Sequence, residues 1–211
     1  MINTGDREYT VARFKDRESV DFGTAETAQI AAYRWENNGI EYEAFGQLAY
    51  AENYGFVCRM ACREEEPWAQ YKNDGEDVYL DSALEFFGQF TGEGYVNCEN
   101  NALGVRLQQF GKNRFDRVPV WEKLPEGFPV AAGRDGDMWT VTVELPLDKL
   151  KVFYKNIDNG TFKKGYRFTG NFYKTGLDPK SGESHYGMWH EIKNETADFH
   201  LPDKFGQFVM G

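Results

Sequence analysis

Apolar and polar residues alternate over many short segments of the chain, and glycines separate these segments. Such period-two alternation, bounded by turn residues, is typical of β-strands that bury one face. Apolar repeats at helical spacing are scarce, which disfavours a helical fold. The strands expected from this pattern cover residues 29–35, 42–50, 56–63, 79–87, 95–101, 104–110, 138–145, 166–173, 186–192 and 206–210.

One short helix is expected over residues 147–153, where the chain passes Pro146 at the end of a strand. Irregular segments are expected over residues 64–77, 111–134 and 175–184. Long loops on a rigid β scaffold often carry binding residues, so these three segments are candidate site segments.

The chain has 211 residues, of which 41% are hydrophobic and 16% aromatic, and this is enough apolar material for one sizeable core. Single all-β domains commonly run to ~200–250 residues. We therefore expect one domain over residues 1–211, an antiparallel β-sandwich of jelly-roll type with one short helix.

Alternate side chains of a strand point to opposite faces of a sheet, so the predicted strands divide into two sets. The set expected to face the core comprises Leu80, Leu84, Phe86, Val96, Cys98, Val105, Leu107, Trp139, Phe168 and Phe172. The opposite set comprises Tyr79, Asp81, Glu85, Asn97, Glu99, Asn101, Arg106, Gln108, Asn171 and Tyr173. This second set is rich in carboxylates, amides and aromatic rings.

Such a face suits a sugar. Sugar hydroxyls accept hydrogen bonds from Asn and Arg and donate them to carboxylates, while the C–H faces of the ring pack on aromatic side chains. An ordinary solvated sheet face with cross-strand polar pairs explains the same pattern. Parity alone leaves both interpretations open.

Six segments in order along the chain resemble the family 9 carbohydrate-binding modules and their cytoplasmic bacterial relatives. The segments are DSALEFF (81–87), YVNCENN (95–101), WTVTVELP (139–146), GNFY (170–173), YGMW (186–189) and DFHLPDKFG (198–206). The resemblance implies a sandwich of antiparallel sheets that binds a saccharide without cleaving it, often at a chain end.

The resemblance also implies a set of ligand-binding residues, in which a sugar ring lies between two aromatic walls. By motif position Glu85 is the acidic ligand, Asn101 and Asn171 are the amide ligands, and Trp189 is one wall. Tyr79 stands where the best-known members have Trp as the other wall.

Glu99 replaces an arginine of the family, which reverses a charge on the binding face, and we expect it to tune specificity. Arg106 and Arg167 are the two candidates for the missing cation.

Two other functions fit parts of the sequence. Glu85 and Glu99 could serve a glycosidase, which needs two carboxylates ~5–5.5 Å apart for retention or ~6.5–9.5 Å apart for inversion. Because the resembled family does not cleave sugars, we expect no enzymatic activity. A protein-interaction domain that has lost the sugar site would show a contiguous apolar patch instead.

Charge and targeting signals narrow the expected partners. The formal net charge of −10 disfavours nucleic acids and anionic membranes. No apolar run approaches the ~18–20 residues of a membrane span, and the N-terminal segment lacks the basic and apolar regions of a signal peptide. A cytoplasmic location is therefore expected, with Cys58, Cys62 and Cys98 as reduced, buried thiols.

No cofactor is expected, with one qualification for a structural calcium ion. Members of the resembled family often carry one, and Asp135 and Asp137 could offer it carboxylate oxygens. A simple β-turn at Gly136 explains the same residues.

Overall fold

The computed structural model of the protein describes residues 8–35, 39–177, 182 and 184–211. Within these residues the fold is nearly all β, as predicted. The strands are β1 (Glu8–Phe14), β2 (Ala28–Gln29), β3 (Ala32–Tyr33), β4 (Ala44–Ala51), β5 (Gly55–Arg63), β6 (Ala83–Thr91), β7 (Gly94–Asn101), β8 (Arg106–Asn113), β9 (Asp116–Pro119), β10 (Val130–Asp135), β11 (Met138–Pro146), β12 (Arg167–Leu177), β13 (Ser184–Met188) and β14 (Gly206–Met210). The helix predicted over residues 147–153 is present but ends earlier, as α1 (Leu147–Leu150), and short 3₁₀ turns include η1 (Val78–Leu80).

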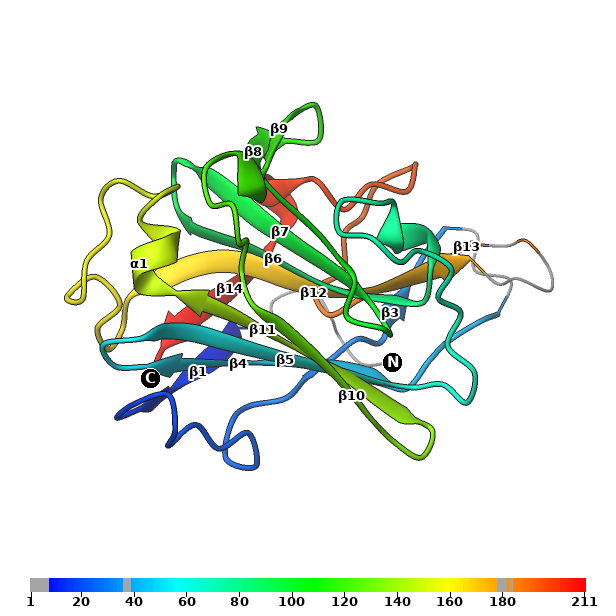
Figure 1. Cartoon of the computed structure of the whole chain (residues 1–211), viewed down its shortest axis with the longest axis horizontal. Helices are drawn as coiled ribbons and strands as arrows, with labels where there is room; N and C mark the ends of the chain where they lie inside the picture. Colours follow the sequence, from blue (N-terminus) through cyan, green and yellow to red (C-terminus); the bar gives the residue numbers. More distant parts are fainter. Residues whose placement is uncertain (1–7, 36–38, 178–181, 183) are drawn as a thin grey trace.

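The strands form one continuous, curled sheet in the order β10-β11-β5-β4-β1-β14-β12-β6-β7-β8-β9. Figure 1 shows β4, β5 and β11 passing alongside β12 and β6, and β5 contacts β6 while β4 contacts β12. The two halves of the sheet therefore face each other across the interior, and β1 joins them.

The expected antiparallel sandwich is wrong in its topology. Strand β1 runs parallel to both of its neighbours, pairing with β14 through residues 8–11 and with β4 through residues 12–14. The sheet is consequently mixed and unbroken, where a sandwich has two separate sheets. Strand β1 was not predicted, and the junction between the halves depends on it.

The core between the two halves follows the predicted parity closely. Leu84 and Phe86 of β6, Val96 and Cys98 of β7, and Trp139 of β11 are all buried in it. Period-two alternation therefore reported the buried face correctly in most strands, because one side of each packs against the opposite half of the sheet.

Strand β8 is an exception, because its parity is the reverse of the prediction. Leu107 faces outward into a cavity. Gln108 is fully buried and hydrogen-bonds the backbone of Phe128 in both directions, accepting from its N–H at 2.8 Å and donating to its carbonyl at 3.0 Å. An amide whose N–H and carbonyl groups are both hydrogen-bonded can be buried at little cost. Gln108 therefore lies on the core side of β8.

The outer face of β12, β6 and β7 is also covered. A second apolar cluster lies there, with Phe87, Tyr95 and Tyr173 from the strands and Phe199 and Phe205 from the segment before β14. This cover leaves part of the outer face open as the cavity described below.

The elements that sequence reasoning missed or altered lie mostly in predicted loops. The irregular segment 111–134 contains β9 and β10, and the predicted strand 29–35 is reduced to β2 and β3. Strand β12 continues to Leu177, while residues 178–181 and 183 of the predicted loop 175–184 lie outside the described residues.

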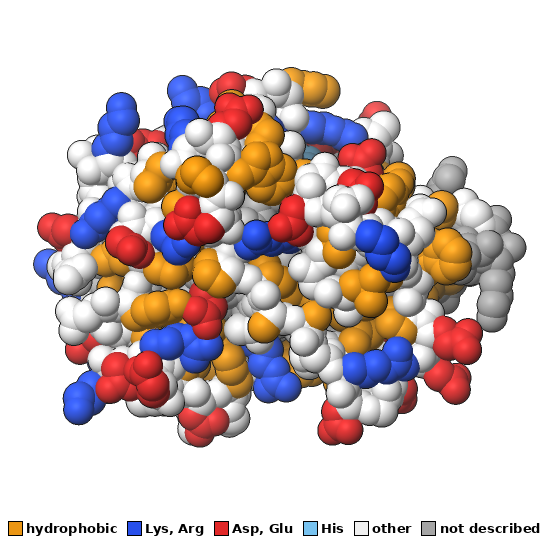
Figure 2. All heavy atoms as spheres, in the orientation of Figure 1, with side chains coloured by type: hydrophobic (Ala, Val, Ile, Leu, Met, Phe, Trp, Pro, Cys, Tyr) orange, Lys and Arg blue, Asp and Glu red, His pale blue; other side chains and the backbone are white. Residues whose placement is uncertain are grey.

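The described surface carries both signs of charge. Figure 2 shows acidic and basic side chains interspersed over one face of the molecule. No helix in the described ranges is long and apolar enough to cross a membrane. Cys58, Cys62 and Cys98 are buried and free, as expected.

Candidate functional site

A cavity of about 420 Å³ opens on the outer face of β6, β7 and β8. Its size lies within the ~300–1,000 Å³ that is common for small-molecule sites. The residues around it come from η1, the sheet, β9, β13 and the segment before β14. They include Asp77, Tyr79, Leu80, Glu85, Glu99, Leu107, Gln109, Arg114, Arg117, Thr175, Tyr186, Asp198, Phe199 and His200.

Two carboxylates form the floor of this cavity. Glu85 of β6 and Glu99 of β7 are direct cross-strand partners, so both side chains leave the same face of the sheet side by side. They are 2% and 3% exposed. Oε1 of Glu85 accepts from Thr175 Oγ1 at 2.6 Å, and Oε1 of Glu99 accepts from Asn97 Nδ2 at 2.6 Å. Among the described residues, the second oxygen of each carboxylate receives no hydrogen bond.

Burial and proximity make this pair hard to ionise. Desolvation, followed by the charge of Glu99, raises the pKa of Glu85 well above its usual value. Desolvation also raises the pKa of Glu99, although the hydrogen bond from Asn97 and the charge of Arg117 oppose the shift. The two groups consequently hold at least part of a proton at neutral pH.

An arginine reaches the floor from β9. The Arg117 guanidinium lies over the Tyr95 ring, with Cζ 4.1 Å from the ring centroid, and its Nη2 donates to Oδ1 of Asn97. Asn97 in turn donates to Glu99, which links the arginine to the carboxylate pair. The Nε and Nη1 atoms of Arg117 are buried and have no hydrogen-bond partner among the described residues. Buried donors are nearly always satisfied, so these two atoms point to a missing partner.

Aromatic side chains stand around the polar floor. Tyr79 on η1 is 41% exposed and lines the cavity from one element, and Tyr186 on β13 lines it from another. Phe199 stacks on Tyr173 with ring centroids 3.9 Å apart and supports Tyr186 edge-on at 6.0 Å. Desolvation, with smaller effects from two nearby arginines, lowers the pKa of His200 to about 3, so this side chain is neutral.

A comparison with protein-family models matches this chain to carbohydrate-binding family 9 over residues 15–210. The chain belongs to carbohydrate-binding family 9. A search of curated proteins gives no significant match.

Solved structures agree with the assignment of the fold. A candidate carbohydrate-binding protein from Bacteroides uniformis is 20% identical, with a TM-score of 0.79 over 97% of this chain and 99% of that chain. A family 9 module from Caldicellulosiruptor kristjanssonii, in complex with glucose, is 11% identical, with a TM-score of 0.65 over 97% of this chain and 96% of that chain. A family 9 module from the same organism in complex with cellotriose is 11% identical, with a TM-score of 0.62 over 97% of this chain and 93% of that chain.

Of the six ligand residues expected in this family 9 protein, Tyr79, Glu85 and Glu99 line the cavity together. Tyr79 was assigned to a strand, but it lies on the 3₁₀ turn η1 that precedes β6. The turn lifts its ring from the sheet to the side of the cavity.

Trp189 lies elsewhere, and its placement as a wall is wrong. It is 3% exposed and packs in the core against Tyr9, Phe172 and Phe208, with ring centroids 5.2–6.2 Å apart. Strand β13 ends at Met188, and the next side chain turns inward over Gly206, where a Cβ atom would lie 2.5 Å from the indole ring. Tyr186, three residues earlier, is the aromatic residue of this motif that lines the cavity.

The two amides are also placed differently from the prediction. Asn101 Nδ2 donates to Asp81 and to the carbonyl of Tyr71, and its Oδ1 accepts from two backbone N–H groups of the following turn. Asn171 exchanges hydrogen bonds with the backbone of His190. Both are buried, neither lines the cavity, and both fix nearby backbone segments instead.

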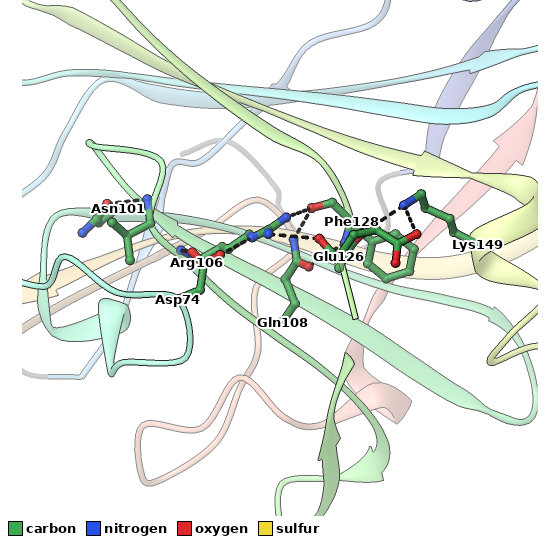
Figure 3. A network of polar contacts seen from close by, with 9 residues as sticks. Asp74, Asn101, Arg106, Gln108, Glu126, Phe128 and Lys149 are labelled. Carbon is green, nitrogen blue, oxygen red and sulfur yellow. Dashed lines mark hydrogen bonds and ion pairs between the residues drawn. The ribbon is translucent and has the colours of Figure 1, made fainter. Parts of the chain in front are cut away.

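The cation beside the carboxylate pair is Arg117, which the sequence did not predict, because the two candidates were Arg106 and Arg167. Arg106 bonds to Asp74 and to the carbonyls of Glu126 and Phe128, outside the cavity (Figure 3). Arg167 is exposed and pairs with Glu8. Arg117 was assigned to a loop, although Gly111 and the Asn113–Asp116 turn were signals for a hairpin that carries it.

The turn proposed for calcium does not fit the ion. The carboxylate of Asp137 pairs with the Arg63 guanidinium, and the carbonyl of Gly136 accepts from Arg134 Nε at 2.8 Å. Cationic groups therefore occupy the directions in which calcium would need oxygens. No cluster of three or more His, Cys, Asp or Glu side chains suited to a metal occurs in the described part of the chain.

Proposed function

We propose that this protein binds a saccharide without transforming it, with one sugar unit in the cavity over Glu85 and Glu99. The observation that carries this proposal is the polar floor itself, where Glu85 and Glu99 each accept one hydrogen bond from the described residues and the neighbouring Arg117 has two buried nitrogens without a partner. Sugar hydroxyls both donate and accept, so a single ring can satisfy both kinds of group.

The aromatic residues favour a sugar over other polar ligands. Tyr79 and Tyr186 approach the cavity from different elements, and their rings can pack on the C–H faces of a pyranose. The similar Caldicellulosiruptor module has been solved with glucose and with cellotriose, which supports a glucose-type unit as the first ligand to examine.

The arrangement of the carboxylates favours binding over cleavage. A glycosidase places its two carboxyl groups on either side of the scissile bond. Glu85 and Glu99 project from neighbouring strands on one face of the sheet, so a ring above them contacts both from the same side.

Isothermal titration calorimetry with a panel of mono- and oligosaccharides, including glucose and cellotriose, tests the proposal. We expect saturable binding to the wild type and a loss of about tenfold or more in Arg117→Gln, because a buried charged donor is removed. The control is Arg167→Gln, which removes an exposed arginine outside the cavity and leaves affinity unchanged.

Tyr79→Ala separates a binding defect from a folding defect, because the ring is partly exposed and its loss leaves the core intact. It should weaken binding while the melting temperature stays within a few degrees of the wild type. A folded wild type that binds no saccharide would overturn the proposal. Turnover of chromogenic glycosides that disappears in Glu85→Gln would replace it with the glycosidase function.

A further inference from the structure

The cavity holds more negative than positive side chains. Four carboxylates line it, from Asp77, Glu85, Glu99 and Asp198, against the guanidinium groups of Arg114 and Arg117. Arg114 lies 3.9 Å from Asp198, so one pair of opposite charges is internal to the rim. The remaining three carboxyl groups, those of Asp77, Glu85 and Glu99, therefore share the cavity with a single remaining guanidinium, that of Arg117.

No cation of the described residues touches the carboxylate pair directly. Arg117 reaches Glu99 only through the neutral amide of Asn97. Lys174, the next residue before Thr175, points to the other face of β12, where its Nζ bonds the Thr175 carbonyl and His185 Nε2 at 2.8 Å each. The lysine ammonium is thus committed to the opposite side of the sheet.

A neutral sugar reduces the repulsion between the two carboxylates only in part. A hydroxyl donates one hydrogen bond and brings no positive charge, so two adjacent buried carboxylates must still share a proton. A ligand ammonium carries three donors and a full positive charge. It can bond the unshared oxygens of both residues and offset their mutual repulsion.

We propose that the sugar bound in this cavity is an amino sugar, whose ammonium group lies between Glu85 and Glu99. This inference rests on the proposed function and names the ligand class for the same site. The hydroxyls of such a sugar remain available to Arg117, and the ring faces to Tyr79 and Tyr186.

The protonation of the pair fits this assignment. The charged groups that act on it are Asp77 from η1, Arg117 from β9 and Lys174 from β12, in addition to the two glutamates of β6 and β7. Burial and the neighbouring carboxylates outweigh the two cations, because the pKa of both glutamates is raised. An ammonium supplied by the ligand would lower both pKa values and expel the shared proton.

Calorimetry with matched sugars tests the inference. Glucose, galactose and mannose are each compared at pH 7 with their 2-amino and 2-N-acetylamino forms, since the acetyl group keeps a substituent and removes the charge. We expect one amino sugar to bind about tenfold or more tighter than both of its neutral counterparts, as a buried charge-assisted contact requires. In Glu99→Gln, which keeps the shape of the side chain, this preference should fall to about twofold or less.

Proton linkage gives an independent readout. At pH 6 the ligand amine is protonated, so titrations in buffers of different ionisation enthalpy should show that the amino sugar releases protons from the wild type and fewer from Glu99→Gln. Neutral sugars should release none.

Three outcomes would overturn the inference. Neutral sugars that bind as tightly as their amino forms would remove it and leave the proposed function intact. If Glu99→Gln still preferred the amino sugar, the ammonium group would have to bind away from the Glu85–Glu99 pair. Failure of every sugar to bind the folded protein would overturn both proposals together.

Discussion

Glu85 and Glu99 show how two residues can set a pH dependence for the whole protein. Each group has a raised pKa in the folded state, that of Glu99 reaching about 7, because burial penalises the charged form first. The folded state therefore binds protons more tightly than the unfolded state. The resulting stability is fully present below the unfolded pKa of about 4.3 and is lost as pH rises through the folded value.

Glu99→Gln should remove much of this dependence. We expect the free energy of unfolding of the wild type to fall between pH 5 and pH 8, and the variant to be more stable than the wild type at pH 8 by roughly 1–3 kcal/mol. At pH 4.5 the two proteins should differ little. Urea denaturation at a series of pH values measures this, and a variant less stable than wild type at pH 8 would contradict the raised pKa.

Trp189 is a residue whose role depends on where its strand ends. Its indole is buried against three aromatic rings, so Trp189→Ala should lower the free energy of unfolding by about 3–5 kcal/mol. The matched control is Trp68→Ala, which removes an indole that is 41% exposed and should change it by less than about 1 kcal/mol. Equal losses in the two variants would refute the assignment of Trp189 to the core.

At the scale of elements, the β8–β9 hairpin decides where Arg117 lies. Gly111 of β8 pairs with Arg117, and its Cα approaches β9 so closely that a Cβ atom would overlap the carbonyl oxygen of Asp116. Oδ1 of Asn113 accepts from the N–H groups of Phe115 and Asp116 and fixes the turn. The hairpin thus holds the guanidinium over Tyr95 through its backbone spacing.

Gly111→Ala should move β9 away from β8 and withdraw the arginine from the floor. We expect saccharide affinity to fall by about tenfold or more and stability to drop by roughly 1–3 kcal/mol, the usual cost of a forced backbone shift. Phe115→Ala on the same turn is the control, because its side chain is 93% exposed. Calorimetric titration of both variants would settle the matter, and an unchanged affinity in Gly111→Ala would show that β9 does not position the site.

The sequence predicted elements well where one face of a strand is buried. Leu84, Phe86, Val96 and Cys98 lie in the core as their alternation indicates, and Glu85 and Glu99 leave the opposite face together. Parity failed in β8, because the buried side is occupied by Gln108, an amide that the backbone of Phe128 satisfies. Local hydrophobicity does not reveal a polar group whose partner lies 20 residues away.

The missed parts of the site have the same kind of cause. Arg117 lies on a four-residue strand, which is too short to show a clear apolar–polar alternation. Trp189 follows the last paired residue of β13. In both cases the direction of one side chain depends on long-range pairing. The resemblance to the family indicated Glu85 and strand parity placed Glu99 on the same face, whereas only the three-dimensional arrangement identified the cation beside them.

At the scale of the whole molecule, β1 makes two half-sheets into one. It pairs in parallel with β14 on one side and with β4 on the other, and it buries Tyr9 and Val11 completely. The Tyr9 hydroxyl accepts from the Leu48 N–H at 2.7 Å and donates to the Glu26 carbonyl at 2.6 Å. Its ring also contacts Trp189 and Phe208 in the core, so the strand ties both halves together by backbone and side chain.

Removal of β1 should therefore affect the entire fold, including a cavity to which it contributes no lining residue. Deletion of residues 1–14 exposes the edges of β4 and β14 and removes two buried core side chains, a combined loss of about 5 kcal/mol or more, comparable with the whole stability of many domains. We expect a broad, low-temperature transition in differential scanning calorimetry and no saccharide binding at room temperature. Deletion of residues 1–7, which leaves β1 in place, is the matched comparison. If the longer deletion retained a sharp transition and bound saccharide normally, the two halves would hold together through their shared core alone, and the parallel junction would be dispensable.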